Sequence, residues 1–593
     1  MKTDHTKARK TRLSRILPRR LAPAVIALAV PALTGCIDDK YDLSDVDTTV
    51  RVNVDNLTVP VNIDQVTLKS IMDLDADSKI KVVDGAYAYV DNGEFHSSGI
   101  RVSGIHIDAP VVEPSIATAE IPGNPFGSRR GGRRAPSYIS VALQGTTTSF
   151  KAETDDVSTS ISGIEKVGAN MSLTINVSIP QLAGNLKTLR LSDVRLRVPR
   201  GMILSSTDGS YNISTGELTI PKLTCNGSSA SISLTATGID AAYSTLDFDE
   251  ASHHISFTDQ LALSSATLGI NASDLTSLDI PSSLQIRTDF NFTPIDVTTF
   301  TGLINYDITD FNVKDVDVSN LPDVLSQEGT DLHLANPQIY FTISNPLSSL
   351  GLTAQTGMAI TSFNGQNQTI GVYSPNEPYF TIGRNPSNTY CMSPLMPSQL
   401  YPGYSGAEHI AYTSLSDILS GDGLPKRLSV AFNDTKVPRQ HVADFRLDHD
   451  YGSVDGTFTI VAPLEFAGGS RLIYTDTLDG WDSEDLDAVT IETLVVRATV
   501  NSDLPIELQL TGYPIDVEGN QISNVEVKGA NVAANAKDQQ VEIYITGSIT
   551  HLDGLRFTAT ATPGEESAPL APDMHIAITD IRPVVSGYYQ KKL

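Results

Sequence analysis

The densest group of residues that could do chemistry is an acidic run around the only tryptophan of the chain. It contains Asp476, Asp479, Asp482, Glu484, Asp485 and Asp487, next to Gly480 and Trp481. Several carboxylates in one turn can supply the roughly six to eight oxygens that Ca²⁺ requires, and an indole ring can stack on a sugar. The candidate calcium ligands are therefore Asp476, Asp479, Asp482 and Asp485. The spacing departs from the EF-hand loop, and an acidic hairpin tip is the alternative interpretation.

Two histidine groups are further candidates for metal ligands. His253 and His254 are consecutive, so in a strand their side chains would point to opposite faces of the sheet. The stretch 441–450 holds three aspartates and two histidines, which an extended chain would scatter. We interpret both groups as solvated polar residues and expect no cofactor other than calcium at the acidic run.

Motifs of known catalytic sites are missing from the sequence. It has no Gly-x-Ser-x-Gly elbow, no Walker loop, no dinucleotide fingerprint and no His-Glu-x-x-His. Ser405, with Glu408 and His409 nearby, lacks the spacing of a serine site. The sequence therefore predicts a protein without catalytic activity.

Cys36 is a thiol in a specific context. It ends the sequence Leu33-Thr34-Gly35-Cys36, directly after the mostly apolar run 21–33, and eight Lys or Arg precede that run against one acid, Asp4. A membrane span needs about 20 apolar residues to cross about 30 Å, so this run is too short. A positive segment followed by a short apolar one is typical of a cleaved signal peptide, and a buried helix is the alternative.

Residues 33–36 resemble the lipobox of bacterial lipoproteins. The resemblance implies cleavage between Gly35 and Cys36 and attachment of lipid, palmitate included, to the Cys36 thiol. Residues 36–49 (CIDDKYDLSDVDTT) are similar to the start of surface-exposed lipoproteins of the Bacteroidota. The resemblance implies an outer-membrane protein, anchored through Cys36 and facing the exterior. The same acids would also make a solvated spacer.

Composition limits the partners. Removal of the first 35 residues takes away eight cations and one acid, so the formal charge changes from −27 to −34. Such a chain is repelled by nucleic acid phosphates, which excludes nucleic acid as a partner. Export would permit a disulfide between Cys225 and Cys391, but domains of this size do not need one, and we expect none.

Period-two alternation dominates the chain and predicts its fold class. Runs such as 100–107 (IRVSGIHI), 171–179 (MSLTINVSI) and 231–236 (SISLTA) alternate apolar and polar residues between turn residues. This pattern predicts antiparallel strands with one buried face. We expect an all-β protein of several tandem antiparallel β-sandwich domains, similar to immunoglobulin or fibronectin domains. Short helical turns are expected at 66–74, 321–325 and 415–419.

Composition shifts suggest the domain limits. We expect a signal peptide at 1–35, an acidic tether at 36–50, and β domains at 51–145, 146–300, 301–425 and 426–593. Residues 121–136 (IPGNPFGSRRGGRRAP) combine Gly and Pro with four arginines, which predicts an exposed, protease-sensitive loop. The alternative, a basic patch for nucleic acid, conflicts with the acidic surroundings.

Two segments resemble each other. Residues 339–363 and 494–517 both contain an alternating strand, an Asn with a nearby Pro, and a second alternating strand, so that Asn345 matches Asn501 and Leu352 matches Leu508. We interpret each as a hairpin with a turn set by Asn and Pro. The pair is similar to the Asn-Pro hairpin of late-embryogenesis-abundant-type β-sandwiches, and convergent turn chemistry explains it equally well.

Together these observations favour a lipoprotein with a binding or structural role at the cell envelope, such as adhesion, surface assembly or capture of a nutrient. We expect its partners to be the membrane, through Cys36, and a surface protein or glycan. Two alternatives remain. A secreted β-sandwich hydrolase would need an aromatic cleft with two carboxylates about 5–10 Å apart. A carrier of an apolar ligand would need a continuous cavity lined by Leu, Ile and Phe.

Overall fold

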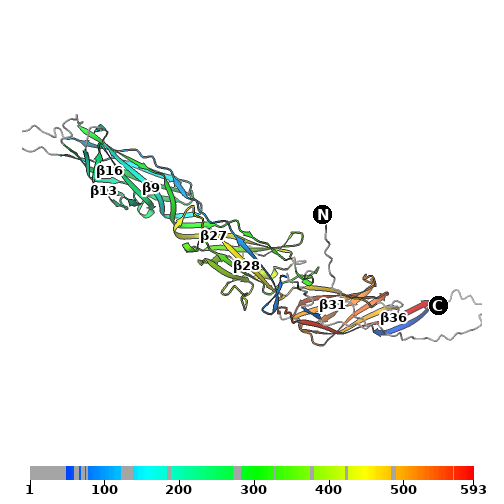
Figure 1. Cartoon of the computed structure of the whole chain (residues 1–593). Helices are drawn as coiled ribbons and strands as arrows, with labels where there is room; N and C mark the ends of the chain where they lie inside the picture. Colours follow the sequence, from blue (N-terminus) through cyan, green and yellow to red (C-terminus); the bar gives the residue numbers. More distant parts are fainter. Residues whose placement is uncertain are drawn as a thin grey trace, which may run out of the picture. The chain divides into compact units, whose positions relative to one another are not determined.

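The computed structural model describes residues 49–592 except 59–65, 69–71, 73, 75–77, 122–137, 144, 183–187, 207–208, 272–281, 319–320, 326, 374–378, 421–424, 482–488 and 565–566. The chain divides into two units, Asn53–Tyr589 and the terminal residues Met1–Val52 with Gln590–Leu593. The first unit contains the strands discussed below, apart from the outer ends of β1 and β36. Figure 1 shows them coloured along the sequence.

The described part of the chain is almost entirely β, which confirms the predicted fold class. Leu68 and Met72 are α-helical, and the other helical pieces are short 3₁₀ turns, η1 to η5: Pro180–Leu182, Ala241–Tyr243, Asp323–Leu325, Ser348–Leu350 and Thr413–Asp417. Leu68 and Met72, and the turns η3 and η5, fall on the predicted helical turns. No helix among the described residues is long and apolar enough to cross a membrane. Alternation places the core as predicted, since Ile232 and Leu234 are buried while their neighbours in the run are exposed.

The strands form three modules, each with two ladders. In module 1 the first ladder runs β6–β17–β9–β14 and the second β8–β16–β10–β13. The ladders face each other, because Phe150 of β8 stacks on Phe292 of β17 with ring centroids 4.8 Å apart. The strands of module 1 are β6 (Ser115–Glu120), β7 (Tyr138–Leu143), β8 (Thr147–Thr154), β9 (Ile161–Ser178), β10 (Thr188–Arg197), β11 (Met202–Ser206), β12 (Ser210–Asn212), β13 (Glu217–Asn226), β14 (Ser229–Asp240), β15 (Leu246–Asp249), β16 (His254–Asn271) and β17 (Ser283–Phe292).

Module 2 repeats this arrangement. Its first ladder runs β4–β28–β21–β25 and its second β18–β27–β22–β24, and Phe341 of β21 contacts Phe380 of β24 across the core. Its strands are β3 (Ile80–Val83), β4 (Ala86–His96), β5 (Ile105–Ile107), β18 (Ile295–Asp307), β19 (Asn312–Val313), β20 (Val316–Asp317), β21 (Gln338–Ser344), β22 (Ala354–Phe363), β23 (Thr369–Tyr373), β24 (Phe380–Ile382), β25 (Ser387–Ser393), β26 (Glu408–Ala411), β27 (Arg427–Arg446) and β28 (Asp455–Pro463).

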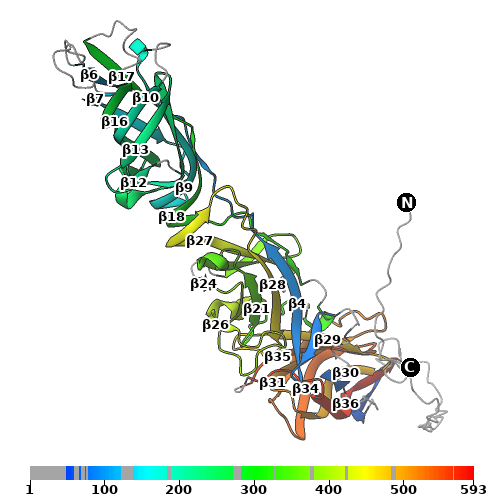
Figure 2. The same cartoon turned by 60° about the vertical axis from the view of Figure 1, so that its left-hand side comes forward.

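Module 3 has the same order again, with ladders β1–β36–β30–β34 and β29–β35–β31–β33. Its strands are β1 (Thr49–Thr58), β2 (Val66–Thr67), β29 (Leu472–Leu478), β30 (Val489–Ser502), β31 (Ile506–Ile515), β32 (Val525–Lys528), β33 (Ala530–Val532), β34 (Gln539–Ile549), β35 (Gly554–Pro563) and β36 (His575–Lys592). Many of these strands are labelled in Figure 2. The three modules therefore share one eight-stranded topology.

The modules are nested in the chain. The leading strands β1, β4 and β6 follow one another at its beginning, yet they pair with the closing strands β36, β28 and β17, which follow one another in the opposite order. The sheets thus do not follow the predicted limits: the segment 51–145, expected as one domain, contributes strands to all three modules. Alternation predicts which face of a strand is buried, but not which distant strand it pairs with.

The two similar segments are not hairpins, which corrects that interpretation. β21 and β22 belong to different ladders, and so do β30 and β31, so each Asn lies where the chain crosses from one sheet to the facing one. Asn345 is 5% exposed. Its Nδ2 donates to the Leu352 and Gly383 carbonyls at 2.8 Å each, and its Oδ1 accepts the Leu347 N–H at 2.9 Å. This side chain replaces the backbone partners that the crossing chain gives up.

We expect Asn345→Ala to destabilise module 2 by about 3 kcal/mol, because it leaves the Leu347 N–H and the Leu352 carbonyl, both in buried residues, without this partner. Asn501→Ala is the matched control. Asn501 is half-buried, and its two hydrogen bonds join it to the exposed Asp538, so its loss should cost about 1 kcal/mol or less. Urea unfolding of both variants measures the difference, and equal costs would contradict the proposed role of Asn345.

Candidate functional site

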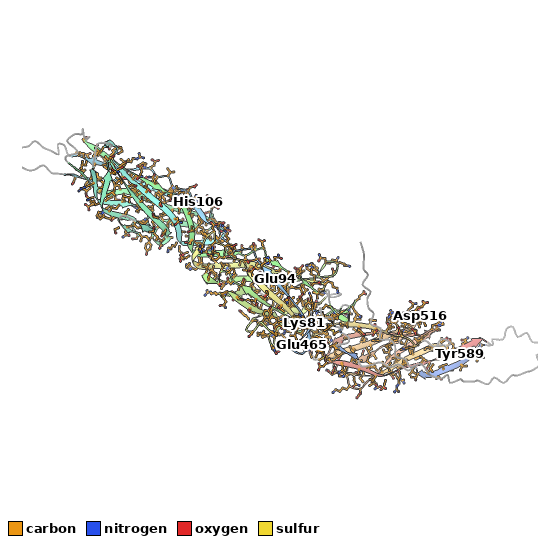
Figure 3. All side chains as sticks on the ribbon, viewed as in Figure 1. Lys81, Glu94, His106, Glu465, Asp516 and Tyr589 are labelled. Carbon is orange, nitrogen blue, oxygen red and sulfur yellow. The ribbon has the colours of Figure 1, made fainter. Side chains whose placement is uncertain are left out.

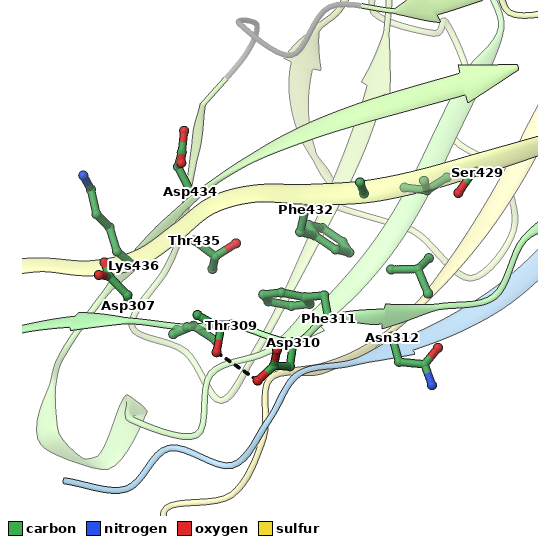
Figure 4. A pocket seen from close by; sticks show the side chains of 14 residues that line it. Asp307, Thr309, Asp310, Phe311, Asn312, Ser429, Phe432, Asp434, Thr435 and Lys436 are labelled. Atoms are coloured by element: carbon green, nitrogen blue, oxygen red, sulfur yellow. Dashed lines mark hydrogen bonds between the residues drawn. The ribbon is translucent and has the colours of Figure 1, made fainter. Parts of the chain in front are cut away.

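A slot of about 700 Å³ opens in the wall of module 2 between β27 and the segment 307–313. Figure 4 shows its lining side chains. The volume lies in the range of known ligand pockets, roughly 300–1,000 Å³. From β27 the slot is lined by Ser429, Val430, Ala431, Phe432, Asp434, Thr435 and Lys436.

The slot exists because β27 loses its neighbour on one edge. On this edge Lys436 pairs with Asp307 of β18, and Leu428 pairs with Val316 of β20. Between these two points the facing chain turns away and pairs with β4 instead, through Asn312 and His96. Before it turns away, its last backbone hydrogen bond to β27 runs from the Ile308 N–H to the Thr435 carbonyl, 2.8 Å. Within the described residues, no strand pairs with the outer edge of 429–434.

The other edge of β27 is fully paired. Residues 427–433 lie opposite 363–357 of β22 without a break. A bulge follows, because Asp434 and Thr435 both lie opposite Thr356, and Asp434 has a φ of 49°. A bulge re-aims the side chains next to it. β27 is therefore held firmly on one side while its other side faces the slot.

The floor of the slot is aromatic. The rings of Phe311 and Phe432 have centroids 5.0 Å apart, and Phe432 also contacts Phe95 at 4.5 Å. Phe311 and Phe432 are half-buried, whereas Phe95 is buried in the core of module 2. In Figure 4 the Phe311 and Phe432 side chains point toward one another from the two sides of the slot. The slot thus offers apolar surface at its base.

The rim of the slot is acidic. Asp307, Asp310 and Asp434 line it against one cation, Lys436, and all four are exposed. The Tyr379 hydroxyl donates a hydrogen bond to Asp434 Oδ2 at 2.9 Å. This bond, together with the negative charge of Asp434, raises the pKa of Tyr379 above its usual value. The rim therefore favours a positively charged ligand.

The predicted site residues stand as follows. Gly35 and Cys36 lie outside the described residues, as do Asp482 and Asp485. Asp476 lies on β29, where its Oδ2 accepts the Tyr474 hydroxyl at 3.0 Å and its Oδ1 the Thr477 N–H at 2.8 Å. Asp479 follows the end of that strand. The calcium site therefore stays a prediction.

Trp481 does not offer a sugar platform. Trp481 is 6% exposed and its side chain belongs to the hydrophobic core, while its backbone N–H donates to the Asp553 carbonyl at 2.7 Å. A buried indole has no free face for stacking, so the predicted sugar contact is wrong. Burial of a large aromatic side chain in a core is favourable, and it takes place here although the residues next to Trp481 in the sequence are acidic.

Several histidines pair with one or two carboxylates each. Four of the pairs, from nitrogen to the nearest oxygen, are His106 with Asp296 (2.5 Å), His254 with Asp155 (2.7 Å), His333 with Asp417 (2.8 Å) and His575 with Asp503 (2.8 Å). His106, labelled in Figure 3, has a raised pKa because of its hydrogen bond to Asp296. No group of three or more metal-ligating side chains occurs among the residues that the structure describes.

One Ser–His pair was not apparent from the sequence. Ser393 Oγ lies 3.0 Å from His409 Nε2, although sequence reasoning pointed to Ser405, which lies in a turn. Ser393 is fully buried, and its hydroxyl donates to the Leu395 carbonyl at 2.7 Å. A nucleophile must reach its substrate and give its proton to the base. This pair therefore serves packing of the loop that follows β25.

Cys225 and Cys391 are both buried and free, on β13 of module 1 and β25 of module 2. Burial raises the pKa of Cys225 to about 11 and also raises that of Cys391. A thiol with a raised pKa holds its proton and is a poor nucleophile. Both cysteines act as small apolar core residues.

No protein-family model and no curated protein matches the chain. Among solved structures, it is similar to the crystal structure of "a putative secreted protein" from Parabacteroides distasonis, with a TM-score of 0.35 and 12% sequence identity. The match covers 48% of this chain and 90% of the other. A likeness this distant carries no inference about function.

We expect Asp434→Asn to lower the pKa of Tyr379 toward its usual value of about 10, because it removes the charged acceptor that favours the protonated hydroxyl. Because the pKa of Tyr379 is raised in the folded state, its protonated hydroxyl stabilises the fold at pH values below the pKa of tyrosine in the unfolded chain. This contribution is lost as the pH rises through the pKa of the folded state. A pH titration of isotope-labelled tyrosine by NMR measures the shift. Asp307→Asn, across the slot, is the control and should change the Tyr379 titration less.

Proposed function

We propose that this protein is a lipoprotein of the bacterial outer membrane that faces the exterior and recognises a partner without transforming it. The observation that carries the recognition role is the slot beside β27. It presents an unpaired strand edge, an aromatic floor and an acidic rim. Such a surface supplies hydrogen-bonding groups and apolar contact. At the Ser393–His409 pair the serine is buried and its hydroxyl donates to a backbone carbonyl, so this pair supplies no exposed nucleophile.

The anchoring role rests on the sequence around Cys36. Thr49, the first residue of β1, follows Cys36 by 13 positions. Even a fully extended chain of that length spans at most about 45 Å. If Cys36 carries lipid, β1 therefore starts within about 45 Å of the membrane. Because β1 pairs with the closing strand β36, module 3 would be the one tied most directly to the anchor.

Lipidation is tested by growing the bacterium, or a host that processes lipoproteins, with a clickable palmitate analogue. We expect the protein to become labelled and to fractionate with the outer membrane. Cys36→Ala should abolish the label, because the thiol is the acceptor, whereas the control Cys225→Ala should keep it. An unlabelled native protein would refute the anchor, and turnover of a substrate by the purified protein would refute the recognition role.

Exposure at the cell surface is tested by treating intact cells with trypsin, which should cut in the arginine-rich segment 129–134. The nested topology predicts an unusual result. The part before the cut contributes β1, β4 and β6 to the three modules, so both fragments should stay together until they are denatured. A denaturing gel should therefore show two fragments, while a native wash releases neither.

The control is a variant with Arg129, Arg130, Arg133 and Arg134 changed to Gln, which should resist this cut. Complete protection of the native protein on intact cells, with cleavage after lysis, would place it on the periplasmic side. Release of the larger fragment by a native wash would contradict the nested pairing.

A further inference from the structure

The outer edge of β27 at Ser429–Asp434 is an interrupted sheet position. Both of its flanks are paired on that same edge, with β18 at Lys436 and with β20 at Leu428. Lys436 follows Leu428 by eight positions, which cover about 26 Å at about 3.3 Å per residue. Within the described residues, backbone groups of 429–434 on this edge have no strand or side-chain partner.

Unpaired N–H and C=O groups at a strand edge are a template for a further strand. At most edges of a sheet this template is open to any chain. Here it lies in a slot whose far wall is the segment 308–313, and an extended chain is the form that can pair along such an edge. A strand in the slot would place alternate side chains on the Phe311–Phe432 floor and turn the others outward.

The acidic side chains at the rim of the slot indicate which kind of chain can bind there. The outward side chains would meet Asp307, Asp310 and Asp434, against the single Lys436. Attraction between such exposed charges steers binding and is weakened by salt. A chain with Lys or Arg at the outward positions is therefore the complementary one.

We propose that the slot binds an extended, positively charged segment of a partner protein as an added strand on β27. The inward residues of this segment are apolar and lie on Phe311 and Phe432, and its outward Lys or Arg side chains lie against the acidic rim. This inference rests on the proposed recognition role and names the class of its partner. The backbone of the bound segment pairs with Ser429–Asp434 and completes the sheet between β18 and β20.

The test uses the full chain, purified from membranes in mild detergent, as the target. Peptides that bind it are selected from a displayed library of random sequences. We expect enriched peptides to alternate apolar residues with Lys or Arg and to bind about tenfold or more weakly when salt is raised from 0.05 to about 0.5 M. On binding, hydrogen exchange of the Ser429–Asp434 amides should slow, because these groups gain partners.

Ala431→Trp is the blocking variant, since Ala431 is exposed on β27 and lines the slot. It should abolish binding, whereas Ala142→Trp, at an exposed strand position of β7 in module 1, should leave binding unchanged. A double variant, Asp310→Asn with Asp434→Asn, should weaken binding without filling the slot. An unchanged unfolding transition shows that each variant is folded.

Several outcomes would overturn the proposal. The first is that the native protein enriches no peptides beyond those enriched by the Ala431→Trp variant. The second is enrichment of acidic peptides, and the third is binding that leaves hydrogen exchange of the 429–434 amides unchanged. Enrichment of sequences like residues 121–136 of this chain would make a second copy the occupant instead of a partner. None of these outcomes bears on palmitate labelling at Cys36, so failure of the slot and failure of the anchor can be told apart.

Discussion

The pairing of a leading strand with a closing strand holds each module together. β6 lies on β17, β4 on β28 and β1 on β36, and in every case the two strands are separated by most of the residues of the module. Contacts this far apart in sequence carry a high entropy cost of closure. Burial of the apolar face of each leading strand in the core of its module offsets this cost. The whole chain is thereby closed by strands from its first quarter.

The shared topology rests on one crossing in each module, where the first core strand passes to the facing sheet. In module 2 the crossing is held by Asn345, whose N–H donates to the Pro386 carbonyl. At the equivalent register in module 1, the Ile179 N–H donates to the Ser228 carbonyl, and Pro180 follows as Pro346 follows Asn345. The geometry is thus kept although the side chain differs. In module 1 the crossing relies on apolar burial of Ile179 instead of amide hydrogen bonds.

The slot is a local departure from this shared plan. The chain between β18 and β20 leaves β27 to pair through β19 with β4 in the other ladder. The sheet gives up hydrogen bonds along six residues of β27, and the Phe95–Phe311–Phe432 contacts fill the space beneath. Sites where a structure breaks its own regularity are where function is usually found, and this one brings backbone, aromatic and acidic groups to a single opening.

The sequence by itself determined the all-β class, the buried faces of the strands and, through residues 2–36, the expectation of export and lipidation. These follow from local pattern: a period of two predicts which side chains are buried, and a positive segment before a short apolar run predicts a signal peptide. It also found the likeness of the segments around Asn345 and Asn501 but took the crossings for hairpins, because both structures need the same turn residues. It missed the copy in module 1, where Ile179 replaces the asparagine. Only the tertiary structure decided the nested pairing, the burial of Trp481 and the slot beside β27, because strand partners are chosen by contacts between segments that lie hundreds of residues apart.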